Sequence, residues 1–182
     1  KAIQDMKEEV LRHFAQDDRP VIEGILVTEF IRFTQGLGYE TLFGIKEDPA
    51  FGPILTLSKG GDDAEFFAKY YNPASLIVPP LSSKEAFNIV NALNISRKFE
   101  AIGHQEYVDM IAEATTLLSR LAYTYSDVAE EKPAYVLKTM DINPFVITED
   151  HRFTAVDGFA QFAPYDEKRC LVSEIRQDHL DL

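Results

Sequence analysis

Residues 135–162, YVLKTMDINPFVITEDHRFTAVDGFAQF, carry the side chains in this sequence best suited to chemistry. Asp141 and Asn143 stand just before Pro144 in an otherwise apolar run, and Asp157 ends a second apolar run. A carboxylate or amide near a buried strand is costly unless another group pairs with it. A divalent cation with oxygen ligands would pair with these groups, and so would backbone hydrogen bonds in a tight turn. From spacing alone the turn interpretation is favoured.

A glycine pair supplies a second candidate feature. Gly60 and Gly61 follow an apolar run, and Glu65 stands four residues further on. Adjacent glycines let backbone N–H groups approach phosphate oxygens closely. A plain loop explains such a pair equally well, because lone glycine pairs are weak evidence for a phosphate site.

Hydrophobic periodicity predicts the elements that must position these residues. Helices are expected over residues 1–15, 82–93 and 105–125, with Ser82 and Glu85 forming a capping box. Strands are expected over residues 21–33, 39–48, 53–61 and 75–81, on both sides of Pro144, and up to Asp157. Residues 64–71 fit a helix or a strand, residues 94–103 a connection, and residues 173–182 a helical start. The short connections favour antiparallel pairing, so the predicted class is α+β with a largely antiparallel sheet flanked by helices.

Composition excludes several function classes. The 182 residues carry a formal net charge of −12, which argues against nucleic acid as a partner. The apolar runs are too short to cross a bilayer, so no membrane partner is expected. A single cysteine, Cys170, excludes an intrachain disulfide and suits a cytoplasmic location. The four histidines show no metal-ligand spacing with another histidine or with the cysteine, which argues against zinc.

Five segments in a fixed order resemble a known family. They are GILVTEF, GYETLFGIKEDPAFGP, KGGDDAE, PPLSSKEA and DINPFVITEDHRFTAVDG. Together they resemble the ATP-grasp domain of the NDP-forming (ADP-forming) acyl-CoA synthetases, which are relatives of the succinyl-CoA synthetase beta chain. The likeness covers residues 1–163 and is strongest in DPAFGP and DINP.

The resemblance implies a Mg²⁺ site and a nucleotide site. Asn143 and Asp157 match the residues that bind the Mg²⁺ bridging the nucleotide phosphates, and Asp141 is a further candidate ligand. The remaining implied contacts are with ATP or ADP: Val27 and Glu29 beside the adenine, and Gly60, Gly61 and Glu65 near the phosphates.

The resemblance also implies a larger protein. Residues 1–163 match the C-terminal lobe of the ATP-grasp domain, without the upstream lobe that carries a phosphate-binding lysine. Residues 164–182 resemble a linker or the start of a following CoA-binding domain. The expected partners are therefore a nucleotide, the upstream lobe and the CoA-binding domain, and an exposed apolar edge would favour a homo-oligomer.

Three functional readings stay open. The first is the nucleotide- and Mg-binding part of an acid–CoA ligase, which transfers a phosphoryl group between ATP and an acyl phosphate or phosphohistidine and is inactive alone. The second is a degenerate ATP-grasp module with a nucleotide-sensing or assembly role, favoured by Ser58, Ile77 and Thr139 at positions where the family pattern differs. The third is a structural domain unrelated to the family. No residue is assigned a catalytic role.

Overall fold

The computed structural model describes residues 1–14, 18–36, 38–61 and 75–166. The chain divides into two compact units, Lys1–Ile31 and Arg32–Leu182. The first contains helix α1, Ala2–Arg12, which confirms the helix predicted over residues 1–15. In the described residues, no helix has both the length and the apolar character that crossing a membrane requires.

The strand predicted over residues 21–33 is wrong. The structure assigns no regular strand there, and only Phe33 forms an isolated antiparallel bridge, to Thr148. Val21, Leu26 and Phe30 are 84–87% exposed. A β-rich sequence needs a neighbouring strand to satisfy its backbone groups, and among the described residues this segment has no strand partner beyond the bridge at Phe33.

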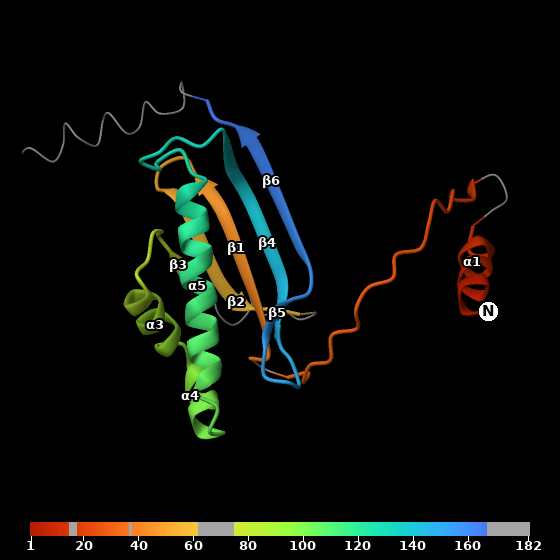
Figure 1. The fold of residues 1–182 in the computed structure, drawn as a ribbon, viewed down its shortest axis with the longest axis horizontal. Coiled ribbons are helices and arrows are strands. Elements are labelled where there is room, and N and C mark those ends of the chain that lie inside the picture. Colours follow the sequence, from red (N-terminus) through yellow and green to blue (C-terminus); the bar gives the residue numbers. More distant parts are fainter. Residues whose placement is uncertain (15–17, 37, 62–74, 167–182) are drawn as a thin grey trace, which may run out of the picture. The chain divides into compact units, whose positions relative to one another are not determined.

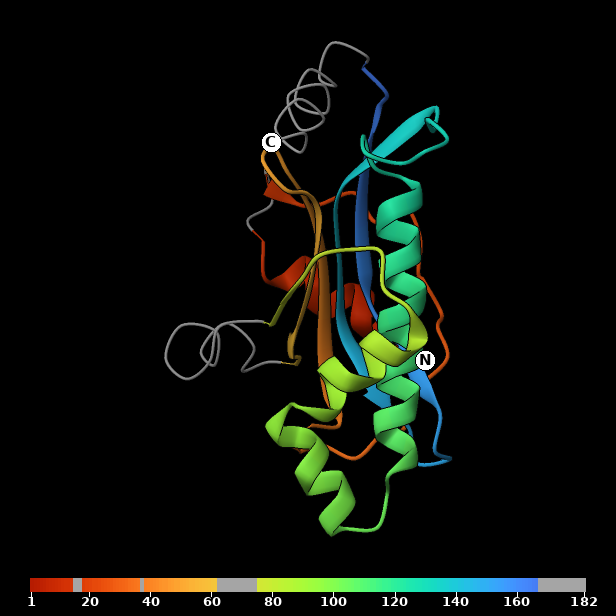
Figure 2. The same cartoon turned by 90° about the vertical axis from the view of Figure 1, so that its left-hand side faces the viewer.

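The second unit is a six-stranded antiparallel sheet with helices against one face (Figures 1 and 2). The strands run in the order β3-β2-β1-β4-β5, and β6 also pairs with β4. The strand bounds are β1 Glu40–Asp48, β2 Gly52–Lys59, β3 Ser75–Ile77, β4 Tyr135–Ile147, β5 Phe153–Ala155 and β6 Gly158–Pro164. The helix bounds are α3 Ser83–Asn91, α4 Asn94–Ala101 and α5 Glu106–Thr124. The predicted α+β class with an antiparallel sheet is confirmed.

Helix α5 buries the apolar face that the sequence predicted. It packs against the helix side of the sheet, which presents Phe43, Leu55 and Ile142 to the core. Helix α3 also packs on α5, and its N-terminus carries the predicted capping box between Ser82 and Glu85. The residues of α5 that are buried on the predicted face are Val108, Ile111, Ala112, Thr115, Leu118 and Ala122.

Two elements were not predicted. Helix α4 occupies the segment expected to be a connection, and it buries Phe99 completely. Its eight residues are too few for a clear helical period, and Ser96 Oγ holds it by donating to the carbonyl oxygen of Val90 at 2.6 Å. Strand β6 was missed because its sequence, GFAQFAP, does not alternate apolar and polar residues as a half-buried strand does. In the structure Phe159 and Phe162 are exposed.

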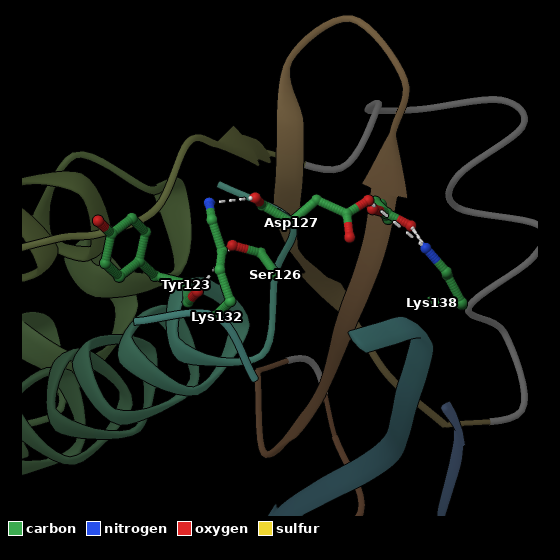
Figure 3. Close-up of polar contacts among 6 residues, drawn as sticks. Tyr123, Ser126, Asp127, Lys132 and Lys138 are labelled. Atoms are coloured by element: carbon green, nitrogen blue, oxygen red, sulfur yellow. Dashed lines mark hydrogen bonds and ion pairs between the residues drawn. The ribbon is translucent and has the colours of Figure 1, made fainter. Parts of the chain in front are cut away.

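A cluster of charges connects β1, β4 and the segment after α5 (Figure 3). Lys138 on β4 forms ion pairs with Glu47 on β1 and, at 3.7 Å, with Asp127. Lys132 Nζ donates to the backbone carbonyl oxygen of Asp127 at 2.9 Å. Burial raises the pKa of Glu47 above its ordinary value of 4.5, and the hydrogen bond that the protonated Glu47 carboxyl donates to Asp127 adds to the effect.

The raised pKa makes the contribution of Glu47 to stability dependent on pH. Below 4.5 the carboxyl group is protonated in the folded and unfolded states alike. Above 4.5 the unfolded state loses this proton first, so the free energy of unfolding decreases with rising pH until the folded state also loses it. We expect Glu47→Gln to remove this decrease. The free energy of unfolding of Glu47→Gln relative to the native chain should therefore rise with pH across the window that begins at 4.5.

Urea denaturation at a series of pH values measures this difference. Glu130→Gln, at an exposed position on the segment after α5, is the matched control, because it removes a carboxyl group without removing the ion pair of Glu47 with Lys138. A difference for Glu47→Gln that stays constant across the pH series would contradict the prediction.

Candidate functional site

A polar row crosses the sheet on the face opposite the helices. Asp141 on β4 pairs with Gly44 on β1, which in turn pairs with Thr56 on β2. Thr56 Oγ1 donates to the carbonyl oxygen of Gly44 at 3.2 Å. A Cβ atom on Gly44 would lie 2.5 Å from Thr56 Oγ1 and 3.2 Å from Asp141 Oδ1, so glycine lets both polar side chains approach the strand between them.

A β-bulge turns Asn143 away from the regular pleat. The pairing of β1 with β4 shifts register there, so that Asn143 and Pro144 together oppose the single residue Leu42. Proline suits this position because it cannot donate a ladder hydrogen bond. The Oδ1 atom of Asn143 accepts a hydrogen bond at 2.9 Å from the backbone N–H of Gly61, which is 82 residues away in the sequence.

Asp157 lies beside this bulge. The backbone N–H of Asn143 donates to the carbonyl oxygen of Asp157 at 3.1 Å. The Oδ1 atom of Asp157 accepts from the backbone N–H of Gly158 at 2.8 Å, and the side chain is exposed. The structure therefore brings together Gly61, Asn143 and Asp157, while Asp141 lies one strand position before Ile142 on the polar row.

The glycine pair is required by close packing. A Cβ atom on Gly60 would lie 2.6 Å from the backbone carbonyl carbon of Thr41, and the Gly60 N–H donates to the carbonyl oxygen of Glu40 at 2.9 Å. Gly61 has a φ of +80°, in the left-handed region that favours glycine. The pair therefore lies against the start of β1 rather than in a free loop.

Sequence reasoning missed Glu40. A Cβ atom on Gly61 would lie 2.6 Å from Glu40 Oε1, so this carboxylate contacts the same glycine as the Asn143 amide. The only signal in the sequence was an acidic residue at the start of an apolar strand, where such residues are common. Glu40 adds an oxygen-bearing side chain beside the two glycines.

The donor set fits a magnesium ion that takes phosphates as its other ligands. Mg²⁺ is bound by one or two carboxylates, and substrate phosphates or water complete its octahedron. Asp141, Asn143 and Asp157 offer carboxylate and amide oxygens of this kind. In the part of the chain that the structure describes, Asp141 and Asp157 belong to no group of three Asp, Glu, His or Cys ligand atoms close enough to hold an ion, so the Asn143 amide, phosphates or water would have to complete the coordination.

The other predicted contacts belong to the first unit or lie outside the described residues. Val27 is 85% exposed and Glu29 is exposed, and both belong to the first unit. Glu65 lies outside the described residues, as do residues 64–71 and 173–182. The domain boundary predicted between residues 163 and 164 stays a prediction.

The family described as "ATP-grasp domain" matches residues 1–160 of the chain. The 4-hydroxybutyrate–CoA ligase [ADP-forming] of Nitrosopumilus maritimus is 23% identical over 128 residues. The acetate–CoA ligase [ADP-forming] I of Archaeoglobus fulgidus is 28% identical over 130 residues. In both cases the match covers 70% of this chain and 16% of the relative, so the chain spans about a sixth of these proteins.

Solved structures show the same fold. The dinucleotide forming acetyl-coenzyme A synthetase 1 of Ca. Korarchaeum cryptofilum, in complex with coenzyme A, Ca-AMPCP and HgCl⁺, aligns with a TM-score of 0.55 at 22% identity. That alignment covers 89% of this chain and 62% of the other. A second structure of the same enzyme, with coenzyme A and Mg-AMPPCP, aligns with a TM-score of 0.51 over 71% of this chain and 55% of the other.

We expect Gly60→Ala to destabilise the fold. The added methyl group would overlap the backbone of Thr41, so β1 or β2 must move, at a cost of about 1–3 kcal/mol in the free energy of unfolding. Urea denaturation measures this cost.

Gly158→Ala is the matched control on the same sheet. Its added Cβ would lie 3.5 Å from the nearest atom, the carbonyl oxygen of Asp141, which is an ordinary contact. This variant should stay within about 0.5 kcal/mol of the native chain. Equal stability of Gly60→Ala and Gly158→Ala would contradict the close packing at Gly60.

Proposed function

Because this chain belongs to the ATP-grasp domain family, we propose that its second unit holds the phosphate end of a Mg–nucleotide site in an ADP-forming acyl-CoA synthetase. The observation that carries the proposal is the hydrogen bond from Gly61 N–H to Asn143 Oδ1. It joins the glycine pair to the Asp-Ile-Asn-Pro bulge, and so places on one side of the sheet two features that the family resemblance assigns to one ligand.

Each residue has a proposed role. Asn143 and Asp157 bind the cation through their side-chain oxygens, and Asp141 is a further ligand at the adjoining strand position. Gly60 and Gly61 keep the backbone free of side chains beside the phosphates. Mg²⁺, when bound, neutralises charge on the phosphates during phosphoryl transfer.

The remaining contacts of the nucleotide are proposed on the resemblance alone. Val27 and Glu29 would lie beside the adenine, and Glu65 near the phosphates. The exposure of Val27 is consistent with a residue that contacts a ligand or another part of the protein.

The proposed reaction of the whole protein is the interconversion of acyl-CoA, ADP and phosphate with a carboxylate, CoA and ATP. The two similar proteins are ADP-forming acid–CoA ligases, and one solved structure of similar fold holds coenzyme A together with Mg-AMPPCP. This chain would contribute nucleotide and Mg²⁺ binding, while the upstream lobe and a CoA-binding domain supply the rest.

Calorimetric titration of ADP tests the proposal, with and without Mg²⁺, on this chain and on a longer chain that restores the upstream lobe. We expect Mg²⁺-dependent binding in the longer chain. Asn143→Ala and Asp157→Ala should each weaken it by about tenfold or more, because each removes an oxygen ligand of the cation.

Asn88→Ala and Asp109→Ala, exposed positions on α3 and α5, are the matched controls and should bind as the native chain does. Circular dichroism should show every variant folded. Absence of binding in a folded longer chain would overturn the proposal in favour of a degenerate module. Unchanged binding in both site variants would overturn the metal-ligand assignment alone.

A further inference from the structure

Two histidines and a glutamate meet where helix α5 begins. His104 precedes α5, Glu106 is in its first turn, and His151 lies in the turn between β4 and β5. Each offers one ligand atom, and these three atoms lie within 4.8 Å of one another. His104 Nδ1 is already 2.6 Å from Glu106 Oε1, and the two imidazole centroids are 5.4 Å apart.

Tyr107 holds the cluster in place. Its ring stacks on His104 with an interplanar angle of 10° and a centroid separation of 4.8 Å. Its hydroxyl group is 2.7 Å from Nδ1 of His151, which is 44 residues away in the sequence. Tyr107 itself is 4% exposed, so a buried side chain orients both imidazoles. A hydrogen bond at Nδ1 leaves Nε2 of His151 as the ligand nitrogen, the arrangement that outer partners of metal-bound histidines impose.

The turn that carries His151 is internally bonded. Thr148 Oγ1 lies 2.6 Å from Asp150 Oδ1 and 2.9 Å from the backbone N–H of Arg152. Arg152 Nε donates to Asp150 Oδ2 at 2.7 Å. His151 has a φ of +58°, uncommon for a residue other than glycine, so the turn fixes this side chain in a defined direction.

We propose that His104, Glu106 and His151 form a binding site for a transition-metal cation of the zinc type. Two imidazole nitrogens and one carboxylate oxygen are a ligand set that Zn²⁺ takes with a fourth position open to water. The cation replaces the proton of the hydrogen bond between His104 and Glu106, and that proton passes to solvent.

The geometry requires a small rearrangement of the three side chains. Ligand atoms around a tetrahedral zinc ion lie roughly 3.4 Å apart when each bond is about 2.0–2.1 Å. A pair at the outer limit of 4.8 Å must therefore close by roughly 1.4 Å, and the pair His104 Nδ1–Glu106 Oε1, now at 2.6 Å, must open by roughly 0.8 Å. His104 and Glu106 have side-chain exposures of 36% and 47%, so the Glu106 carboxylate has room to rotate while the stack on Tyr107 keeps the His104 ring in place.

The chemistry separates this site from the proposed Mg²⁺ site. Imidazole suits zinc and related ions, whereas Mg²⁺ selects oxygen ligands and retains its water. A bound ion would join the start of α5 to the turn after β4. Because the three ligands meet only in the folded state, ion binding would stabilise that state. The site does not depend on the nucleotide proposal, because it shares no residue with it.

Zinc titration of the full 182-residue chain tests the proposal, with calorimetry for affinity and the thermal unfolding midpoint as a second readout. We expect one Zn²⁺ per chain and a raised midpoint. His104→Ala and His151→Ala should each raise the dissociation constant by about tenfold or more, and Tyr107→Phe should raise it by a smaller factor. Mg²⁺ should neither bind there nor compete.

His13→Ala, His179→Ala and Cys170→Ser are the controls, because these residues are the histidines and the cysteine outside the cluster. Each should leave the affinity unchanged, and Co²⁺ in place of zinc should show no thiolate charge-transfer band. Zinc binding that is lost in Cys170→Ser, or that is equal in the native chain and in the double variant His104→Ala/His151→Ala, would overturn the proposal.

Discussion

The antiparallel pairing of β1 with β4 is the contact on which the rest of this structure depends. It joins strands whose paired side chains, such as Glu47 and Lys138, are 91 residues apart in the sequence. Its register sets Phe43 against Ile142 on the helix side and Gly44 against Asp141 on the polar side. One pairing therefore decides which residues form the core and which form the candidate site. A shift of one residue would exchange the two faces.

The bulge in this pairing gives the candidate site its shape. A regular ladder would alternate the side chains around Asn143 and Pro144, and would leave the amide on one fixed face. Because Asn143 and Pro144 together oppose Leu42, the Asn143 side chain leaves the regular pleat. It accepts a hydrogen bond from the N–H of Gly61, just beyond the end of β2. The glycine pair completes the arrangement, since a side chain at Gly60 would push β2 away from β1. The hydrogen bond from Gly61 to Asn143 and the lack of a side chain at Gly60 therefore both keep the end of β2 close to β1 and β4.

The sequence predicted the elements whose pattern is local, and it failed where the pattern depends on distant partners. Helix α5 and the capping box of α3 were correct because their periods and caps lie within one segment. Residues 21–33 read as a strand from β-branched composition alone, but composition cannot supply a pairing partner. Asn143 was singled out from its motif, whereas its contact with Gly61 and the proximity of Glu40 follow from topology. The same holds for His104 and His151, which have no ligand spacing in the sequence and meet only in the fold.

Strand β4 therefore connects the two proposed ligand sets, which differ in chemical hardness. The bulge near its end presents oxygen donors in a chain whose net charge is −12. Because the carboxylates and the phosphates are both negative, phosphates approach favourably only when a cation lies between them. The turn that follows the strand presents an imidazole to a second imidazole and a single carboxylate. Nitrogen ligands bind Mg²⁺ poorly. A site that needs phosphate oxygens to complete the octahedron of its ion binds that ion weakly when no nucleotide is present. The two proposed sets would thus select different ions although only a few residues of one strand and its turn separate them.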